Sequence, residues 1–544
     1  MPECRELLAA AMLFHTWTFF VFLLVVLPGF YLLGRTRLWV PWLLLASYVF
    51  YGWWNPYYLL LVGYSTALDF LLVALMDHCP PGPPAVGWRE RLRRPQFSDG
   101  TLKAAFLVSG ACALACLGFA LFGLPTLRPT LAVFTLICGL MAVGAFFASR
   151  AVWLVVSLVN NLAILLFFKY AQFLVENGNA LLARLHVAFT LPDPASLMPF
   201  GAAYVLPVGI SFFTFQSLSY SIDFYRGRVH RERNFIRFAA FVSFFPQLMA
   251  GPIERAAHLL PQFYEFPKIR PQDITDGLSL FLVGLFKKLA LANYLSYYVE
   301  RIYDQPKAYG APALILGTVA FAWQIFFDFS GYTDMARGLA KLMGFNLMLN
   351  FNNPYLATGL GEFWGRWHIS LSSWFRDYLY IPLGGNKEGT AKTYRNLFIT
   401  FFVSGIWHGA AWTFVIWGLL HALGVMVTRE LERSVVYRER VPRLLKQLGV
   451  FAFVCFAWIF FRAASLTDAL LIVQRIFTAS WTDPQMPALM LAIIAVIWAY
   501  QLALESRFRP LLQLSPVRVS LAVAMILYMF LCASGGGAFI YFQF

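Results

Sequence analysis

Long apolar segments recur along this chain, and they restrict its fold more than any other feature. A transmembrane helix needs about 20 consecutive apolar residues, and segments of that length follow one another through almost the whole sequence. With a mean hydropathy of +0.65 and only 13% charged residues, a single soluble core cannot bury so much apolar surface. We therefore predict an all-α polytopic membrane protein.

Some predicted spans are too long or too irregular to be simple crossings. The run 396 to 428 exceeds one crossing, and Gly405 and Gly409 flank its first histidine, so we expect a bend or two half-helices there. Residues 238 to 251 contain a proline and lead into a Gly-Pro pair, which indicates a re-entrant or broken element. The predicted spans are 12 to 34, 38 to 54, 57 to 76, 103 to 123, 130 to 148, 152 to 175, 203 to 222, 274 to 299, 311 to 329, 396 to 428, 447 to 464, 487 to 505 and 519 to 540.

The formal net charge of +15 is concentrated in short loops beside the apolar spans. Cytoplasmic loops of membrane proteins carry such an excess of Lys and Arg, so we place these loops in the cytoplasm and both termini outside. No zinc-finger or single-strand-binding pattern accompanies the charge, and we expect no nucleic-acid partner. The basic segments lie at residues 35 to 37, 89 to 103, 226 to 237, 429 to 446 and 507 to 518.

Two histidines lie in aromatic, apolar surroundings. His368 belongs to the run Phe-Trp-Gly-Arg-Trp-His-Ile-Ser-Leu, and His408 to Ser-Gly-Ile-Trp-His-Gly-Ala-Ala-Trp. His408 is 13 positions beyond the last cation, Arg395, which corresponds to about 20 Å along a helix. An ionisable group at that depth indicates a functional site, although a histidine hydrogen-bonded between helices is the structural alternative.

The aromatic residues of 363 to 378 recur at helical spacing, with Arg366 and Asp377 off the stripe. This pattern predicts an amphipathic helix in or near the membrane face. A simple membrane anchor explains the pattern too, but His368 adjoins the stripe and can turn inward.

The sequence argues against several kinds of enzyme chemistry. There is no Walker loop, GxSxG, HExxH or GxGxxG motif. We expect no metal site, because no carboxylate or cysteine lies at ligand spacing beside His368, His408 or His421. His408 and His421 also lie about 220° apart around a straight helix. A buried, neutral imidazole suits another task, which is to take a proton from an alcohol as it attacks an activated acyl group.

The motifs resemble the membrane-bound O-acyltransferase superfamily, and most closely its bacterial alginate O-acetyltransferase branch. The resemblance covers roughly residues 1 to 78 and 152 to 544. It rests on the run 363 to 386, on the Trp-His-Gly core at His408 and on the later His421. Further matching segments are 50 to 56, 206 to 216, 250 to 253, 328 to 336 and 539 to 544.

The resemblance implies a helical core with re-entrant and amphipathic helices around a transmembrane tunnel. We divide the chain into N-terminal transmembrane helices at 1 to 78, a basic cytoplasmic loop plus two extra spans at 79 to 151, a catalytic core at 152 to 446, and C-terminal transmembrane helices at 447 to 544. The extra spans have no counterpart in the family pattern, and Ala422 follows His421 where relatives usually have glycine.

The resemblance also implies a reaction and its residues. His408 matches the family's tunnel histidine and is expected to be the general base, helped by His368. The donor is expected to be cytoplasmic acetyl-CoA, a substrate rather than a permanently bound cofactor. Acceptors are a hydroxyl of an exported, alginate-like polysaccharide or a periplasmic acetyltransferase partner, reached across the bacterial inner membrane. Candidate ligands of the coenzyme A phosphates are Lys287, Lys288, Arg366 and Arg376.

Two alternatives remain open from the sequence. A lipid or protein O-acyltransferase with a different donor is the nearer one, because tunnel width decides between donors. A proton-coupled transporter or flippase is the second, with Asp328 and Asp334 as relay groups, although an ion pair between Asp334 and Arg337 explains that aspartate more simply. Asp69 and the pair Asn160 and Asn161 are expected to form hydrogen bonds between helices.

Overall fold

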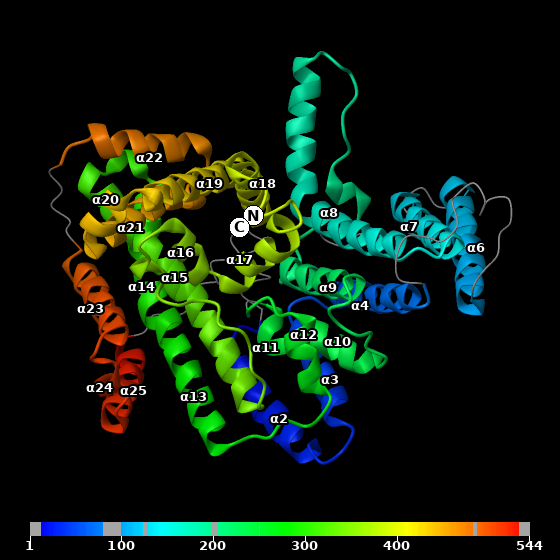
Figure 1. Ribbon diagram of the computed structural model, residues 1–544, viewed down its shortest axis with the longest axis horizontal. Coiled ribbons are helices and arrows are strands. Elements are labelled where there is room, and N and C mark those ends of the chain that lie inside the picture. The colour runs from blue at the N-terminus through cyan, green and yellow to red at the C-terminus, as the bar shows by residue number, and fades with distance from the viewer. Residues whose placement is uncertain are drawn as a thin grey trace. The chain divides into compact units, whose positions relative to one another are not determined.

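A computed structural model describes residues 12–79, 99–122, 128–198, 204–249, 251–481 and 487–532, and every regular element in these ranges is a helix (Figure 1). Within them, eight helices are long and apolar enough to cross a membrane, and five more apolar helices are shorter. The predicted all-α polytopic membrane fold is confirmed. The terminal motif at 539 to 544 and most of the basic loop after residue 79 lie outside the described residues.

The helices divide into two units, of which the first consists of Met1–Met12, Val21–Met249 and Glu254–Pro267. Its helices include a two-helix hairpin, α6 and α7, that leaves most of its apolar surface exposed. These are the two extra spans, so their helical nature is confirmed. The elements are most of α2 (Trp17–Leu33), α3 (Trp39–Gly52), α4 (Pro56–Asp77), α6 (Gly100–Phe122), α7 (Arg128–Phe147), α8 (Arg150–Arg184), η2 (Pro194–Leu197), α9 (Ile210–Tyr225), α10 (Phe235–Ser243), α11 (Phe245–Leu248), α12 (Ala256–Leu259) and η4 (Leu260–Phe263).

Buried polar side chains join the helices of the first unit. Asp69 on α4 accepts hydrogen bonds from Ser157 Oγ at 2.7 Å and from Asn161 Nδ2 at 3.0 Å, both on α8. The Tyr64 hydroxyl of α4 donates to Asn160 Oδ1 at 3.0 Å. The predicted hydrogen bonds between helices are therefore present, and they satisfy polar groups where no water is available.

Several predicted helix boundaries in the first unit shift in the structure. α8 has 35 residues and ends at Arg184, so it is about 52 Å long and continues nine residues past the predicted end at 175. An apolar span needs only about 30 Å, and the polar residues of the last turns extend the helix beyond it. The element predicted at 238 to 251 instead runs from Phe235 to Leu248, and its predicted break is confirmed, because α10 ends at Ser243 and α11 begins at Phe245.

The second unit consists of Leu13–Phe20, Ala250–Ile253 and Lys268–Phe544, and it contains all three candidate histidines. Its elements are α13 (Pro271–Phe286), the π-helix η5 (Lys287–Ala292), α14 (Asn293–Asp304), η6 (Pro306–Ala308), α15 (Ala311–Leu342), η7 (Pro354–Leu356), α16 (Leu360–Arg366), α17 (Ile369–Phe375), the π-helix η8 (Arg376–Tyr380), α18 (Thr390–His408), α19 (Trp412–Arg433), α20 (Val435–Arg440), α21 (Arg443–Arg462), α22 (Leu466–Thr478), α23 (Ala488–Leu504), α24 (Arg509–Leu512) and α25 (Ser515–Cys532).

Helix α15 is the core of the second unit, because 83% of the residues in its most apolar stretch are buried. α13 runs beside it (Figure 1). The two backbones approach closely through glycines, since a Cβ on Gly277 would lie 2.9 Å from the carbonyl oxygen of Gly338. Small residues at such crossings are typical of membrane helices, where packing rather than the hydrophobic effect drives association.

The long predicted run 396 to 428 is two helices. α18 ends at His408 and α19 begins at Trp412, so the predicted break is confirmed. The two helices pack against each other as a hairpin, and a Cβ on Gly405 would lie 2.5 Å from the carbonyl oxygen of Phe414 and 3.2 Å from the Cα of Gly418. Glycine is required at this crossing because any side chain would push the helices apart.

Replacing Gly405 with alanine is expected to destabilise the hairpin by about 1–3 kcal/mol, the usual cost of overpacking a close contact. Thermal unfolding of the purified protein in detergent measures it. The matched control is Gly63→Ala in α4, where an added Cβ meets nothing within 4 Å and helix propensity favours alanine. Equal melting temperatures for the two variants would contradict the close crossing of α18 and α19.

Candidate active site

His368 lies at a break between two short helices. The segment predicted as one amphipathic helix at 363 to 378 is instead α16, α17 and the π-helix η8. His368 adopts a left-handed backbone, with φ 43° and ψ 53°, which non-glycine residues rarely do. Asn350 holds this break, because its carbonyl oxygen accepts from the Ile369 N–H at 2.9 Å and its Oδ1 accepts from the Ser370 N–H at 3.2 Å.

The aromatic stripe of this segment is buried inside the protein instead of forming a membrane-facing surface. The exposed fractions of Phe363, Trp367 and Leu371 are 0%, 3% and 1%. Trp367 lies against Trp458 of α21, with ring centroids 5.2 Å apart. The prediction that His368 turns inward is confirmed, because its side chain is only 1% exposed.

The hydrogen bonds of Asn350 determine which nitrogen of His368 carries the proton. Asn350 Oδ1 must be the acceptor, because the Ser370 backbone N–H and Oγ–H both donate to it. His368 Nδ1, 3.1 Å from the same oxygen, is therefore the protonated nitrogen, and Nε2 carries the lone pair. Burial away from water lowers the pKa of His368 to about 3, so this imidazole is neutral at pH 7.

His408 is the last residue of α18, at the turn of the helical hairpin. It is 5% exposed and is surrounded by aromatic rings. The ring centroids of Trp407, Trp417 and Phe461 lie 4.9, 4.8 and 5.3 Å from that of its imidazole. Trp407 also approaches His368, at 6.4 Å, so one indole contacts both candidate catalytic imidazoles.

His421 lies deeper, on α19, and is fully buried. Trp417 contacts it at 4.8 Å, the same centroid distance that this indole keeps from His408. Neither ring nitrogen of His421 has a hydrogen-bond partner within the part of the chain that the structure describes. The break after His408 thus allows two histidines that would point apart on a straight helix to pack on one tryptophan.

A cavity of about 370 Å³ adjoins these rings. None of the three histidines lines it, but Ser404 does, one helical turn before His408, and so does Ile369, next to His368. Arg376 is the only cation among the lining residues. The wall consists of Gly361, Trp364, Gly365, Ile369, Leu371, Ser372, Ser373, Phe375, Arg376, Tyr380, Leu397, Thr400, Phe401, Ser404 and Val425.

Two of the candidate cations for coenzyme A lie in ion pairs with α15. Lys288 Nζ is 2.6 Å from Asp328 Oδ1, and both side chains are buried. Lys287 Nζ is 2.7 Å from Asp334, which also pairs with Arg337 at 3.7 Å, so the predicted ion pair of Asp334 is confirmed. These lysines stabilise the packing of the π-helix η5 on α15.

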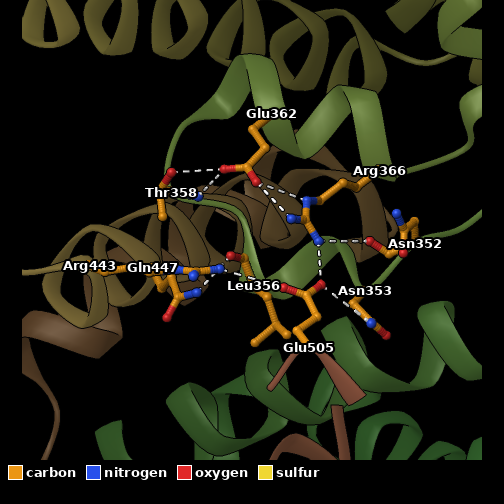
Figure 2. A network of polar contacts seen from close by, with 9 residues as sticks. All are labelled: Asn352, Asn353, Leu356, Thr358, Glu362, Arg366, Arg443, Gln447 and Glu505. Carbon is orange, nitrogen blue, oxygen red and sulfur yellow. Dashed lines mark hydrogen bonds and ion pairs between the residues drawn. The ribbon is translucent and has the colours of Figure 1, made fainter. Parts of the chain in front are cut away.

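Arg366 belongs to a network of ion pairs and hydrogen bonds (Figure 2). Its guanidinium lies 2.8 Å from Glu362 on α16 and 2.6 Å from Glu505 at the end of α23, and Arg443 of α21 approaches the same Glu505 at 3.5 Å. Partial burial alone would raise the pKa of Glu362, but hydrogen bonds from Thr358 and Arg366 outweigh it and hold that pKa below its usual value. Arg366 therefore ties the helix just before His368 to two other helices.

Arg376 differs from the other candidate cations. Its side chain is mostly exposed, it lines the cavity, and its partner is its own neighbour Asp377, at 2.8 Å. Of the four predicted phosphate-binding residues, the structure brings only this one to the cavity.

The sequence did not indicate Asn350 or Trp417 as site residues. Asn350 lies 18 positions before His368, in the segment Asn-Phe-Asn-Asn-Pro, whose composition is typical of a loop. Trp417 is one of 17 tryptophans in the chain, and its contacts with the imidazoles of His408 and His421 become visible only in the structure.

Comparisons with known proteins match this part of the chain. The model of MBOAT, the membrane-bound O-acyltransferase family, matches residues 208–467, which include all three histidines. The probable alginate O-acetylase AlgI of Pseudomonas aeruginosa is 35% identical over 470 residues, which cover 86% of this chain and 75% of the relative. The peptidoglycan O-acetyltransferase of Helicobacter pylori is 36% identical, with 60% and 65% covered. The teichoic acid D-alanyltransferase of Bacillus subtilis is 28% identical, with 47% and 68% covered.

Replacing Asn350 with alanine removes the acceptor of three buried donors, each of which costs about 1–3 kcal/mol when left unsatisfied. We expect a clear loss of thermal stability in detergent. Asn352→Ala is the matched control, because that side chain is exposed and its backbone carbonyl remains. An Asn350→Ala variant as stable as the control would show that this amide does not hold the break at His368.

Replacing Arg366 with methionine is expected to lower the melting temperature, whereas Arg433→Met, which removes an exposed ion pair with Glu430, changes it little. Because hydrogen bonds and Arg366 lower the pKa of Glu362 below the ordinary glutamate value of 4.5 in the folded state, the stabilising contribution of this carboxylate is present at neutral pH and is lost in acid, as the pH falls through the lowered pKa. The difference between wild type and Arg366→Met is thus expected to shrink in acid. A difference that grows in acid would contradict the network.

Proposed function

Because this chain belongs to the membrane-bound O-acyltransferase family and is thus an acyltransferase, we propose that it moves an acetyl group from cytoplasmic acetyl-CoA to a hydroxyl of a cell-surface polysaccharide. The reaction takes place within a bacterial inner membrane, with His408 as general base. The alternative acceptor is a periplasmic protein, which would receive the acetyl group first and then complete the transfer to the polysaccharide.

The position of His408 carries this proposal. It ends α18 at the turn of the hairpin, 13 residues beyond Arg395, and its side chain is only 5% exposed. An ionisable side chain buried among apolar rings points to a functional role. Aromatic rings exclude water around it. A general base in such surroundings works on the proton of a bound hydroxyl without competition from solvent.

The proposed step forms one bond and breaks another. The acceptor oxygen attacks the carbonyl carbon of the acetyl thioester, and His408 takes the hydroxyl proton. When the carbon–sulfur bond breaks, that proton passes to the leaving thiolate, so coenzyme A leaves as the thiol and the imidazole is neutral again. No metal and no net proton transfer are needed.

His368 supports the same step by accepting a hydrogen bond. Its Nδ1–H is held by Asn350, so Nε2 is the nitrogen that accepts from the acceptor hydroxyl and orients it. Arg376 at the cavity is our candidate for a phosphate of the donor, since guanidinium groups bind phosphate in a fixed geometry. The proposal requires a passage that extends the cavity from Ser404 to the His408 ring.

The named relatives support the acceptor class. Their names specify alginate, peptidoglycan and teichoic acid as the modified polymers, all of which belong to the bacterial cell surface or its exported products. Two of the three names specify acetyl transfer, and the identity is higher to these two than to the alanyltransferase. This favours acetyl as the acyl group and argues against a transporter or flippase.

Replacing His408 with glutamine is expected to lower acetyl transfer by about 10²- to 10⁴-fold, the usual contribution of a general base. The measurement is the acetyl content of exported glycans from cells with equal membrane levels of the wild-type and variant chains. The control is His230→Ala, an exposed histidine outside the candidate site. Unchanged acetylation in His408→Gln would remove this residue from the mechanism.

A second readout separates acyl transfer from transport. Purified protein in detergent is incubated with radiolabelled acetyl-CoA and no membrane gradient, and release of free coenzyme A is followed. We expect slow thioester cleavage that His408→Gln abolishes. Gradient-dependent uptake in liposomes without thioester cleavage would instead support a transporter.

A further inference from the structure

A second cavity of about 440 Å³ lies in the second unit, away from the histidines. It is formed where the segment before α13 meets the end of α15. None of the residues that line the aromatic cavity or surround the three histidines contributes to it. Its walls are Lys268, Arg270, Asp273, Lys341, Gly344, Phe345 and Asn346.

The cations around this cavity are only partly neutralised. Lys268 makes no ion pair with any residue that the structure describes. Arg270 is paired with Asp273 at 3.0 Å, whereas Lys341 lies 3.3 Å from Asp276. Asp276 is shared with Arg518 of α25, at 3.7 Å. Four basic groups therefore face two carboxylates, and the excess positive charge favours an anionic ligand.

Two helix ends of opposite polarity meet at the cavity, so the side-chain cations decide its charge. α13 begins here at Pro271 with its positive N-terminal end, and α15 ends here at Leu342 with its negative C-terminal end, so the two helix dipoles offset each other. Asp273 and Arg270 neutralise each other within the first turn of α13. An added negative charge would therefore meet Lys268, and also Lys341, whose partner Asp276 is shared with Arg518.

The ends of two helices give the position of the cavity. α13 begins beside it and α15 ends beside it, so it is at one end of two antiparallel membrane helices. The basic segment 507 to 518 belongs to the same end through the Arg518 contact with Asp276, which marks this end as cytoplasmic by the distribution of positive charge. Ile274 and Leu278, one turn apart on α13, are 40% and 56% exposed and offer an apolar surface next to the cavity.

We propose that this cavity binds the phosphate group of an anionic phospholipid from the cytoplasmic leaflet. Lys268 and Lys341 contact the phosphate, and the acyl chains lie along the exposed apolar face of α13. Basic pockets beside membrane helices on the cytoplasmic side recognise such headgroups. A soluble phosphate ester shares the charge but has no use for the apolar face, which favours the lipid. The proposal does not depend on the acyltransfer mechanism.

The test uses the full-length protein in detergent. Binding of phosphatidylglycerol and of phosphatidylcholine is measured by native mass spectrometry for the wild type, for the double variant Lys268→Gln/Lys341→Gln and for a control, Lys387→Gln/Lys392→Gln. The control removes the same charge from exposed lysines of the same unit. Adenosine 3′,5′-bisphosphate is added as a competitor to represent a soluble phosphate ester.

We expect the wild type and the control to bind phosphatidylglycerol more tightly than phosphatidylcholine, and the cavity variant to bind phosphatidylglycerol about tenfold more weakly. Equal melting temperatures of the three proteins show that the variants are folded. Unchanged phosphatidylglycerol affinity in the cavity variant, or an equal loss in the control, would overturn the proposal. Displacement of the lipid by adenosine 3′,5′-bisphosphate would assign the cavity to a soluble ligand instead and would overturn it as well.

Discussion

A lipid bilayer offers no water to polar groups, so each one inside it needs a partner from the protein. The second unit satisfies this constraint by charge pairing: Lys288 with Asp328 and Lys287 with Asp334, both between the π-helix η5 and α15. The first unit uses neutral donors around Asp69 instead. These contacts fix helices within each unit, and they give the charged residues at Lys287, Lys288, Asp328 and Asp334 a structural role.

The candidate site combines two local exceptions to regular helix geometry. His368 occupies a left-handed position between α16 and α17, and His408 ends α18 before the turn into α19. A straight helix through the second segment would place His408 and His421 about 220° apart, whereas the break lets both rings pack on Trp417. Trp407, on α18, contacts the rings of His368 and His408. Backbone strain at such a site persists only when its surroundings hold it, and Asn350 and the Arg366 network supply that support.

The sequence predicted the features that depend on local pattern. Apolar length identified the membrane helices, two glycines indicated the break near His408, and the spacing of Asp334 and Arg337 indicated their ion pair. It did not predict the break at His368, because that break depends on Asn350, whose hydrogen bonds to His368 and Ser370 join residues 18 and 20 positions apart in the chain. For the same reason the cations looked available for phosphate: the Glu505 partner of Arg366 lies 139 positions away. The residue types identified the candidate cations, but only the tertiary contacts showed which of them are already held in ion pairs.

The glycine contact between α18 and α19 also limits how the site can move. Gly405 and Gly418 bring two backbones together with no side chains between them, so one helix has little room to slide or rotate without the other. Any opening that admits a substrate must therefore move α18 and α19 together as one rigid body, which includes His408 at the turn of the hairpin and His421 within α19. The hinges of such a motion lie in the connecting segments at its open end, where residues 384 to 389 include three glycines with positive φ.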